Sequence, residues 1–294
     1  MLVFDHPAIS RLISMALEED LGRGDVTTQA TIPPDRRAYG NINAKADLTV
    51  AGLPLAQRIL ALVDPAAELR GLVNEGTAVK KGHVVAEMQG NAAALLIAER
   101  TMLNFLQHMS GVATLTRKFV DAIAGTKCKI IDTRKTLAGF RLLDKYAVTQ
   151  GGGTNHRMGL DDGILIKDNH IAVCGGVGAA VRRARENASS LLRIEVECTN
   201  LTEVQEAIDA RADIILLDNM STTLMADAVR LVNGRALLEA SGNMSLDRVR
   251  EVAETGIDFI SVGALTHSVS AVDLSMSVTV ESSTANVQGP KSKA

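Results

Sequence analysis

Short apolar runs alternate with amphipathic stretches along the second half of the chain. The runs are rich in Ile, Leu and Val and cover residues 129–133, 163–167, 193–198, 213–218, 236–241 and 258–263. Stretches between them, such as 201–211 and 245–256, repeat apolar residues at helical spacing and so predict helices with one buried face. A strand that is apolar at consecutive positions and precedes a helix is typical of a parallel sheet covered on both sides. The pattern therefore predicts a β/α barrel of six or seven units over residues 129–265, fewer than the usual eight.

The first part of the chain follows a different pattern. Alternating apolar and polar positions predict antiparallel strands, and helical periodicity predicts helices beside them. The strands lie within residues 38–52 and 76–90, and the helices at 7–21 and 53–64. A long helical stretch runs from Asn91 to about Ala124, with a break predicted at Ser110-Gly111. These elements predict an α+β domain that helices join to the barrel.

Composition and charge exclude several classes of protein. A net charge of −3 and only 2% aromatic residues argue against a nucleic-acid surface, which needs basic patches and stacking platforms. No segment has the roughly 18 consecutive apolar residues of a membrane span, and the first residues lack the features of a signal peptide. Three isolated cysteines, Cys128, Cys174 and Cys198, form neither a zinc pattern nor a disulfide framework. We therefore expect a cytoplasmic protein with reduced thiols.

Polar residues or glycines follow nearly every strand of the predicted barrel. The residues at these strand ends are Asp132 to Lys135, Lys167 to His170, Glu197, Asp218 and Asn219, Ser241 to Asn243, and Gly263. The C-terminal ends of barrel strands meet at one rim, where such barrels carry their active sites. The loop 151–160 adds three successive glycines, His156 and Arg157 to the same rim. The sequence therefore predicts one site built from several loops.

Four cations converge on this rim, namely Arg134, Lys135, Arg157 and Lys167. Without a ligand they repel one another, whereas guanidinium and ammonium groups together suit a polyanion. We therefore expect an anionic substrate that binds through carboxylate or phosphate groups. The alternative for Lys135 or Lys167 taken singly is a solvated lysine with no ligand.

Carboxylates and phosphate-binding turns complete the predicted site. Glu197 and Asp218 lie on neighbouring strands, where they suit a divalent cation, sugar hydroxyls or a developing positive charge. A structural ion network with the lysines is the alternative for this pair. The last two strands end at Ser241 to Asn243 and at Val262 to Ala264, positions where many barrels bind phosphate through backbone N–H groups. The residues alone thus predict an enzyme that acts on an anionic, phosphorylated substrate.

Long motifs that occur in a fixed order resemble the quinolinate phosphoribosyltransferase family. The segment ALEEDLGRGDVTT at 16–28 is similar to that family's N-terminal region. The other motifs are ERTMLNFLQHMSGVATLT (99–116), DTRKT (132–136), GGGTNHRMGL (151–160), LIKDNH (165–170), EVE (195–197), LLDN (216–219), EASGN (239–243) and SVGALTHS (261–268). The resemblance covers the chain up to about Met276.

The resemblance implies an α/β fold of the type II phosphoribosyltransferase kind, with an N-terminal α/β sandwich domain and an incomplete, seven-stranded β/α barrel. We assign residues 1–112 to the first domain and 113–269 to the barrel, with 270–294 packing back or flexible. The resemblance also implies a reaction of de novo NAD biosynthesis. Quinolinate and phosphoribosyl pyrophosphate give nicotinate mononucleotide, pyrophosphate and CO₂ in the presence of Mg²⁺. Both substrates are polyanions, in agreement with the cationic rim.

The resemblance further implies roles for individual residues in a homodimer with shared active sites. Quinolinate is implied to bind to Arg100 of the partner subunit, Arg134, His156, Arg157 and Lys167. The other residues implied to bind substrate are Thr133, Lys135, Glu197, Asp218, Ser241, Gly242, Asn243, Val262, Gly263, Ala264 and His267. Lys135, Lys167, Glu197 and Asp218 are implied to be catalytic, and the two carboxylates to hold Mg²⁺ directly or through the substrate.

One loop departs from the family pattern. DTRKT is usually followed by Thr-Pro-Gly-Leu-Arg, whereas here residues 137–141 are Leu-Ala-Gly-Phe-Arg. The Leu137-Ala138 replacement removes a hydroxyl and the φ restraint of proline, which bears on the mobility of the loop.

Three alternative functions remain beside the resemblance. A molybdenum-transport-associated pyrophosphorylase-like protein shares the fold, but the intact His156-Arg157 pair and LIKDNH motif favour a dicarboxylate pocket. A nicotinate phosphoribosyltransferase binds a monocarboxylate and needs fewer cations. A non-catalytic anion-binding barrel does not require Glu197 and Asp218, and both are present.

Overall fold

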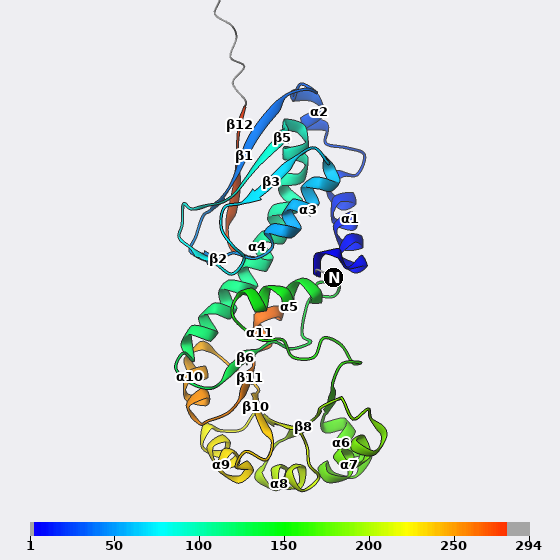
Figure 1. The fold of residues 1–294 in the computed structure, drawn as a ribbon, viewed down its shortest axis with the longest axis vertical. Helices are drawn as coiled ribbons and strands as arrows, with labels where there is room; N and C mark the ends of the chain where they lie inside the picture. Colours follow the sequence, from blue (N-terminus) through cyan, green and yellow to red (C-terminus); the bar gives the residue numbers. More distant parts are fainter. Residues whose placement is uncertain (1–2, 281–294) are drawn as a thin grey trace, which may run out of the picture.

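An antiparallel sheet forms the centre of the N-terminal part of the molecule (Figure 1). The computed structural model describes residues 3–280. Its four strands stand in the order β12-β1-β5-β3 and are β1 (Arg37–Ala44), β3 (Glu68–Gly71), β5 (Val84–Asn91) and β12 (Leu274–Val280). A separate pair consists of β2 (Leu48–Thr49) and β4 (Ala78–Val79). The helices here are η1 (Val3–Asp5), α1 (Pro7–Leu21), α2 (Val26–Thr31), α3 (Leu53–Val63) and α4 (Ala92–Ala122).

Sequence periodicity accounts for the way these elements pack. Along β1, Ala38, Ile42 and Ala44 are buried, while Arg37 and Tyr39 on either side of Ala38 are exposed, so one face of the sheet is apolar. Helices α3 and α4 pack against the sheet and against each other. The predicted antiparallel strands and helices of this part are confirmed.

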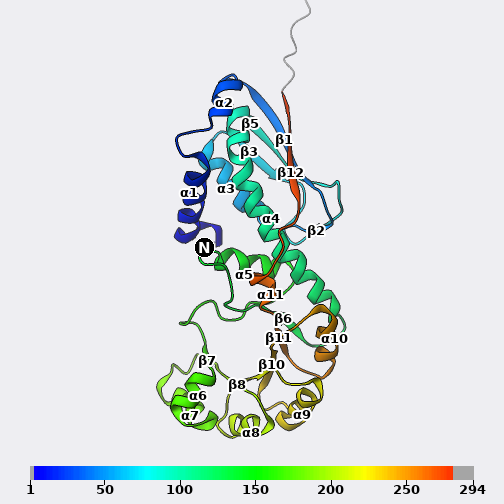
Figure 2. The same cartoon turned by 180° about the vertical axis from the view of Figure 1, so that it is seen from behind.

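Strand β12 brings the end of the described chain back to the N-terminal part. In Figure 2 it runs beside β1, and Met276 stands opposite Ile42 in the antiparallel register. The pattern of residues 274–280 did not predict this strand. The rest of the segment 270–294, which we predicted to pack back or to be flexible, lies outside the described residues from residue 281 onward.

The long helix α4 is continuous, so the break predicted at Ser110-Gly111 is wrong. Both residues are buried and serve packing instead. The Ser110 hydroxyl accepts a hydrogen bond from the backbone N–H of Ala51 at 3.0 Å. A Cβ atom on Gly111 would stand 2.5 Å from the carbonyl oxygen of Ser270, so only glycine lets the chain cross the helix this closely.

A parallel sheet of six strands forms the C-terminal part, in the order β6-β11-β10-β9-β8-β7. The strands are β6 (Lys129–Ile131), β7 (Ile164–Ile166), β8 (Ile194–Cys198), β9 (Ile214–Asp218), β10 (Leu237–Ser241) and β11 (Phe259–Ser261). Beyond β6, Thr154 adds one further parallel bridge to Ile131. All six predicted strands are confirmed, and the seventh position of the sheet is reduced to that single bridge among residues 3–280.

The helices of the C-terminal part are α5 (Arg141–Gln150), α6 (Asp168–Cys174), α7 (Val177–Asn187), α8 (Leu201–Asp209), α9 (Thr222–Val232), α10 (Leu246–Glu254) and α11 (Ala264–His267). Helices α6 to α10 lie around the outside of this sheet, as the β/α pattern predicts, whereas α5 and α11 lie between the sheet and the N-terminal part (Figure 1). Helix α4 contacts both parts, because it packs on the N-terminal sheet and also against α5, α10 and β6. None of the helices within residues 3–280 combines the length and apolar character that a membrane crossing requires.

Candidate active site

The strand ends gather the predicted polar residues at one rim of the sheet. Lys167 directly follows β7, and its Nζ atom lies 2.9 Å from Oε2 of Glu197 on the neighbouring strand β8. Asp218 ends β9 and stands in register with Ser241, which ends β10. The structure therefore brings Lys167 and Glu197 into direct contact and places Asp218 beside Ser241.

Another group of the predicted residues meets at the end of β11. A Cβ atom on Gly263 would stand 3.2 Å from both Nε2 of His267 and Cδ of Lys135. The Thr133 hydroxyl accepts the Lys135 backbone N–H at 3.0 Å. Ala264 begins α11, whereas the N–H of Val262 is already used in a 3.0 Å bond to the carbonyl of Ile131.

Left-handed backbone conformations shape the turns after β9 and β10. Asn219 has φ 52°, Gly242 φ 96° and Asn243 φ 45°. A Cβ atom on Gly242 would stand 2.2 Å from Oδ1 of Asn219. Glycine is therefore required there both for its left-handed φ and for this close approach. The Asn219 side-chain amide donates to Oδ2 of Asp218 at 2.8 Å and orients this carboxylate.

Two arginines carry hydrogen-bond donors that the protein leaves unsatisfied. The Nε atoms of Arg134 and Arg157 are buried and lack a partner among the described residues. Nη1 of Arg157 donates to the carbonyl of Gly163 at 2.9 Å. Burial, and next the positive charge of Arg134, lower the pKa of Arg157. An anionic ligand supplies acceptors for the unsatisfied Nε donors, and its negative charge offsets the repulsion between the two arginines.

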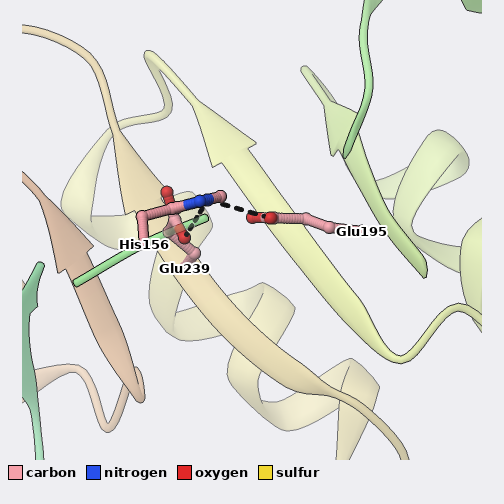
Figure 3. A group of neighbouring side chains, drawn as sticks. All are labelled: His156, Glu195 and Glu239. Atoms are coloured by element: carbon pink, nitrogen blue, oxygen red, sulfur yellow. Dashed lines mark ion pairs between the residues drawn. The ribbon is translucent and has the colours of Figure 1, made fainter. Parts of the chain in front are cut away.

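His156 lies inside the barrel, below the rim, and its side chain is only 14% exposed. Its Nδ1 atom accepts the backbone N–H of Arg157 at 2.7 Å. Its Nε2 atom lies 3.0 Å from Oε2 of Glu195 and 3.5 Å from Oε2 of Glu239 (Figure 3). Both ring nitrogens of this predicted ligand thus have protein partners in the structure.

The two glutamates beneath His156 were not singled out from the sequence. A usable signal was present, because side chains two residues apart point to the same face of a strand. Glu195 precedes Glu197 by two positions in β8, and Glu239 precedes Ser241 by two positions in β10.

A fully buried ion pair holds the loop that carries His156. Lys145 and Asp132 are both 0% exposed and contact each other through Nζ and Oδ1. The Lys145 ammonium also donates to the carbonyl of His156 at 2.9 Å, while Asp132 accepts the backbone N–H of His156 at 2.8 Å. Asp132 ends a predicted strand, but nothing in the helical pattern of 141–150 marks Lys145 as its partner.

The glycine run and Arg100 have separate places in the fold. A Cβ atom on Gly151 would stand 2.5 Å from Cβ of Thr116, and one on Gly153 would stand 2.8 Å from Cγ2 of Thr116, so these glycines pack under α4. Arg100 is exposed on α4, in the N-terminal part of the molecule. No hydrogen bond or ion pair found within residues 3–280 joins it to the rim of its own chain.

Comparison with known proteins identifies the family to which this arrangement belongs. Residues 25–110 match the N-terminal domain and residues 112–277 the C-terminal domain of quinolinate phosphoribosyl transferase. The chain belongs to the quinolinate phosphoribosyltransferase family. A probable nicotinate-nucleotide pyrophosphorylase [carboxylating] of Synechocystis is 47% identical over 265 residues, which are 89% of this chain and 90% of that protein. The chloroplastic enzyme of that name from Arabidopsis thaliana is 44% identical and aligns over 94% of this chain and 85% of its own length.

Solved structures of the family share the whole fold. NadC from Streptococcus pyogenes has a TM-score of 0.90 at 39% identity and covers 93% of this chain and 97% of its own. The nicotinate-nucleotide pyrophosphorylase of Francisella tularensis has the same TM-score at 40% identity, with 94% and 99% of the two chains covered. Human nicotinic acid phosphoribosyltransferase, at 13% identity and a TM-score of 0.59, shares the fold alone. The parallel sheet and the N-terminal sheet domain are therefore those of the quinolinate phosphoribosyltransferase fold.

Proposed function

We propose that the chain transfers the phosphoribosyl group of phosphoribosyl pyrophosphate to quinolinate, with loss of CO₂. The products are nicotinate mononucleotide and pyrophosphate. Two observations carry the proposal: the described residues leave buried guanidinium donors of Arg134 and Arg157 unsatisfied, and Lys167 and Glu197 pair at the ends of neighbouring strands. The relatives named above carry the same activity in their names.

The cationic side of the rim binds quinolinate in this proposal. Arg134 and Arg157 offer planar guanidinium groups, which suit two adjacent carboxylates, and Lys167 adds a third cation. The buried Nε donors of both arginines support this role, since a dicarboxylate supplies acceptors that the described part of the chain does not. His156 closes the inner wall of the pocket and fixes the backbone of Arg157.

The phosphoribosyl donor occupies the other side of the rim in the proposal. Ser241 to Asn243 and Gly263 lie at the ends of β10 and β11, where backbone N–H groups suit the 5′-phosphate. The Lys135 side chain lies next to Gly263, because a Cβ atom there would stand 3.2 Å from Cδ of Lys135, and its ammonium group suits the pyrophosphate. The two carboxylates Glu197 and Asp218 fit Mg²⁺ as oxygen ligands, together with water and substrate oxygens. When bound, Mg²⁺ neutralises charge on the leaving pyrophosphate.

The chemistry follows from positioning and charge. The pyridine nitrogen attacks the anomeric carbon of ribose while the bond to pyrophosphate breaks, and the ribose ring gains positive character in between. Glu197 and Asp218 stabilise that character electrostatically. The nitrogen then carries positive charge, which stabilises the carbanion left when the adjacent carboxylate departs as CO₂. A proton added to that ring carbon completes nicotinate mononucleotide.

We propose that two chains share each active site. Arg100 is exposed and forms no hydrogen bond or ion pair with its own rim among the described residues, in agreement with a role in the pocket of a partner subunit. A cavity of about 440 Å³ lies between α1, α4 and the loop at Leu137 and Phe140. Apolar side chains such as Met15, 65% exposed, and Leu137, 51% exposed, border it. Exposed apolar side chains around a hollow suit a protein interface.

We also propose a cytoplasmic location. The three cysteines are unpaired in the structure, and Cys128 and Cys198 are buried. Burial raises the pKa of both thiols to about 12, so they remain unreactive core residues. Free thiols of this kind are usual in reducing compartments.

Product analysis with two acceptors tests the proposed function. Pure protein is incubated with Mg²⁺, phosphoribosyl pyrophosphate and either quinolinate or nicotinate, and nucleotides are separated by chromatography. Nicotinate mononucleotide is expected from quinolinate only, and Glu197→Gln is expected to abolish it. The matched control Glu254→Gln changes an exposed residue of α10 and should leave the rate unchanged. Product from nicotinate alone would instead identify a nicotinate phosphoribosyltransferase.

A further inference from the structure

Two buried glutamates inside the barrel have no role in the function proposed above. Glu195 points inward from β8 and Glu239 from β10, on either side of β9, and both are nearly inaccessible to solvent (Figure 3). Oε1 of Glu195 is buried and has no hydrogen-bond partner among the described residues. Two ionised carboxylates in such a place are costly, and they also oppose the binding of a dianion just above them.

The hydrogen bonds of His156 define which ring nitrogen carries hydrogen. The Arg157 backbone N–H can only donate, so Nδ1 of His156 accepts that bond. The hydrogen of the neutral ring is therefore on Nε2, which donates to Oε2 of Glu195 at 3.0 Å. Glu195 acts as the acceptor of this bond, while Glu239 lies farther from the ring, at 3.5 Å.

The surroundings of Glu239 favour its protonated form. Burial is the main cause that raises its pKa well above the usual range, and the charge of Glu195 is the next. A hydrogen bond from Ser261 on β11 and the charge of Lys167 after β7 act in the opposite direction but are weaker. Arg157, Asp162 and Arg193 are the other charged residues that line the cavity containing His156, Glu195 and Glu239. Neighbouring carboxylates that share one proton are a known consequence of such crowding.

We propose that Glu239 stands beneath His156 as a carboxylic acid, donates its hydrogen to Glu195, and acts as a positioning residue for the quinolinate pocket. The hydrogen gives the Glu195 carboxylate the donor that it lacks. Glu195 in turn holds His156 in its Nε2–H form, and His156 holds the Arg157 backbone at Nδ1. The shared proton also halves the negative charge beneath the dianionic substrate. The role in substrate binding rests on the proposed function, whereas the protonation state does not.

The same three side chains could instead surround a metal ion, since their ligand atoms all lie within 4.8 Å of one another. That arrangement requires Nε2 without hydrogen and both carboxylates ionised. The Nε2 hydrogen demanded by the Arg157 bond opposes it. The two possibilities make different predictions for the experiment.

Infrared difference spectroscopy tests the protonation state without any substrate. A spectrum of wild type minus Glu239→Gln at neutral pH is expected to show the carbonyl stretch of one protonated carboxyl group. Glu254→Gln removes an exposed carboxylate. The spectrum of wild type minus Glu254→Gln should therefore show carboxylate bands and no stretch of a protonated carboxyl group. A carboxylate band alone in the first spectrum overturns the proposal. Stoichiometric Zn²⁺ or Mg²⁺ binding that Glu239→Gln abolishes also overturns it.

Steady-state kinetics tests the positioning role. Glu239→Gln keeps a neutral hydrogen-bond donor, so its KM for quinolinate should stay within about threefold of wild type. Glu239→Leu removes the donor and should raise this KM by about 10- to 100-fold, the fold-change that corresponds to the loss of a hydrogen bond to a charged group. The proposal is overturned if Glu239→Gln raises the KM for quinolinate as much as Glu239→Leu does while its melting temperature is unchanged. That result would show that the ionised form of Glu239 is needed. If wild type is inactive but shows the infrared band, the proposed function is refuted, whereas the protonated state of Glu239 stands.

Discussion

Replacing Lys145 with methionine tests whether the buried ion pair holds the His156 loop. Lys145 and Asp132 are both 0% exposed, so Lys145→Met leaves the Asp132 carboxylate in the interior without its cation. Breaking one side of such a pair costs about 3–5 kcal/mol. Asp132 keeps the His156 N–H at 2.8 Å, and its other oxygen lies 2.7 Å from the Asn155 amide nitrogen once that amide is turned so that its nitrogen faces the acceptors around it. These donors offset part of the cost. We therefore expect the low end, a loss of about 3 kcal/mol in the free energy of unfolding.

Urea denaturation followed by circular dichroism measures this loss at one fixed protein concentration. Lys127→Met is the matched control, because it makes the same chemical change in an exposed ion pair with Asp258. The control should lose less than about 1 kcal/mol. The double variant Asp132→Asn/Lys145→Met removes both charges and should recover at least about 1 kcal/mol relative to Lys145→Met. If Lys145→Met lowers the free energy of unfolding no more than Lys127→Met does, the buried ion pair does not hold the His156 loop.

Four further predictions concern binding, assembly, backbone strain and pH. Arg157→Ala should lower kcat/KM for quinolinate by about 100-fold with little change in melting temperature, since it loses charged hydrogen bonds to substrate. Coexpressed Arg100→Ala and Lys167→Ala subunits should recover about one quarter of wild-type activity, because half of the dimers are mixed and each mixed dimer has one intact site. Gly242→Ala should lower the free energy of unfolding by about 1–3 kcal/mol and raise the KM for phosphoribosyl pyrophosphate, because φ there is 96°. The folded protein holds the Glu239 proton above the ordinary pKa of 4.5, so the stability of wild type relative to Glu239→Gln should fall as pH rises from about 5 through the raised pKa.

For each of these four predictions, one experimental result would contradict it. A large fall in the melting temperature of Arg157→Ala would make that residue structural. No recovery in the mixed dimers would place Arg100 outside the shared site. A fully stable Gly242→Ala would show that the turn does not need glycine, and parallel pH curves for wild type and Glu239→Gln would show that Glu239 titrates normally.

The fold was largely predictable because it depends on local hydrophobic patterns. Consecutive apolar residues followed by helical periodicity defined all six strands of the parallel sheet. The errors came from tertiary contacts that periodicity does not report. Ser110-Gly111 looks like a helix break in isolation, but in the fold it lets the chain at Ser270 cross α4. Strand β12 exists because its residues pair with β1, more than 200 positions earlier in the chain.

The rim of the site was predictable for a related reason, since strand ends in a parallel sheet meet at one edge. Lys167 and Glu197 were expected together, and they form an ion pair. The layer below the rim was not expected. Glu239 could have been found from its two-residue spacing to Ser241, but Lys145 reaches Asp132 from a helix whose pattern gives no sign of it. Interior polar networks depend on such long-range pairings, which one sequence does not display.

Isotope-labelled quinolinate provides the most direct test of the central claim. The carboxyl group next to the ring nitrogen carries ¹³C, and the pure protein receives this acceptor with phosphoribosyl pyrophosphate and Mg²⁺. The account predicts ¹³CO₂ and unlabelled nicotinate mononucleotide in equal amounts, with one pyrophosphate for each. Folded protein that forms no nucleotide, or a nucleotide that retains the label, would contradict it.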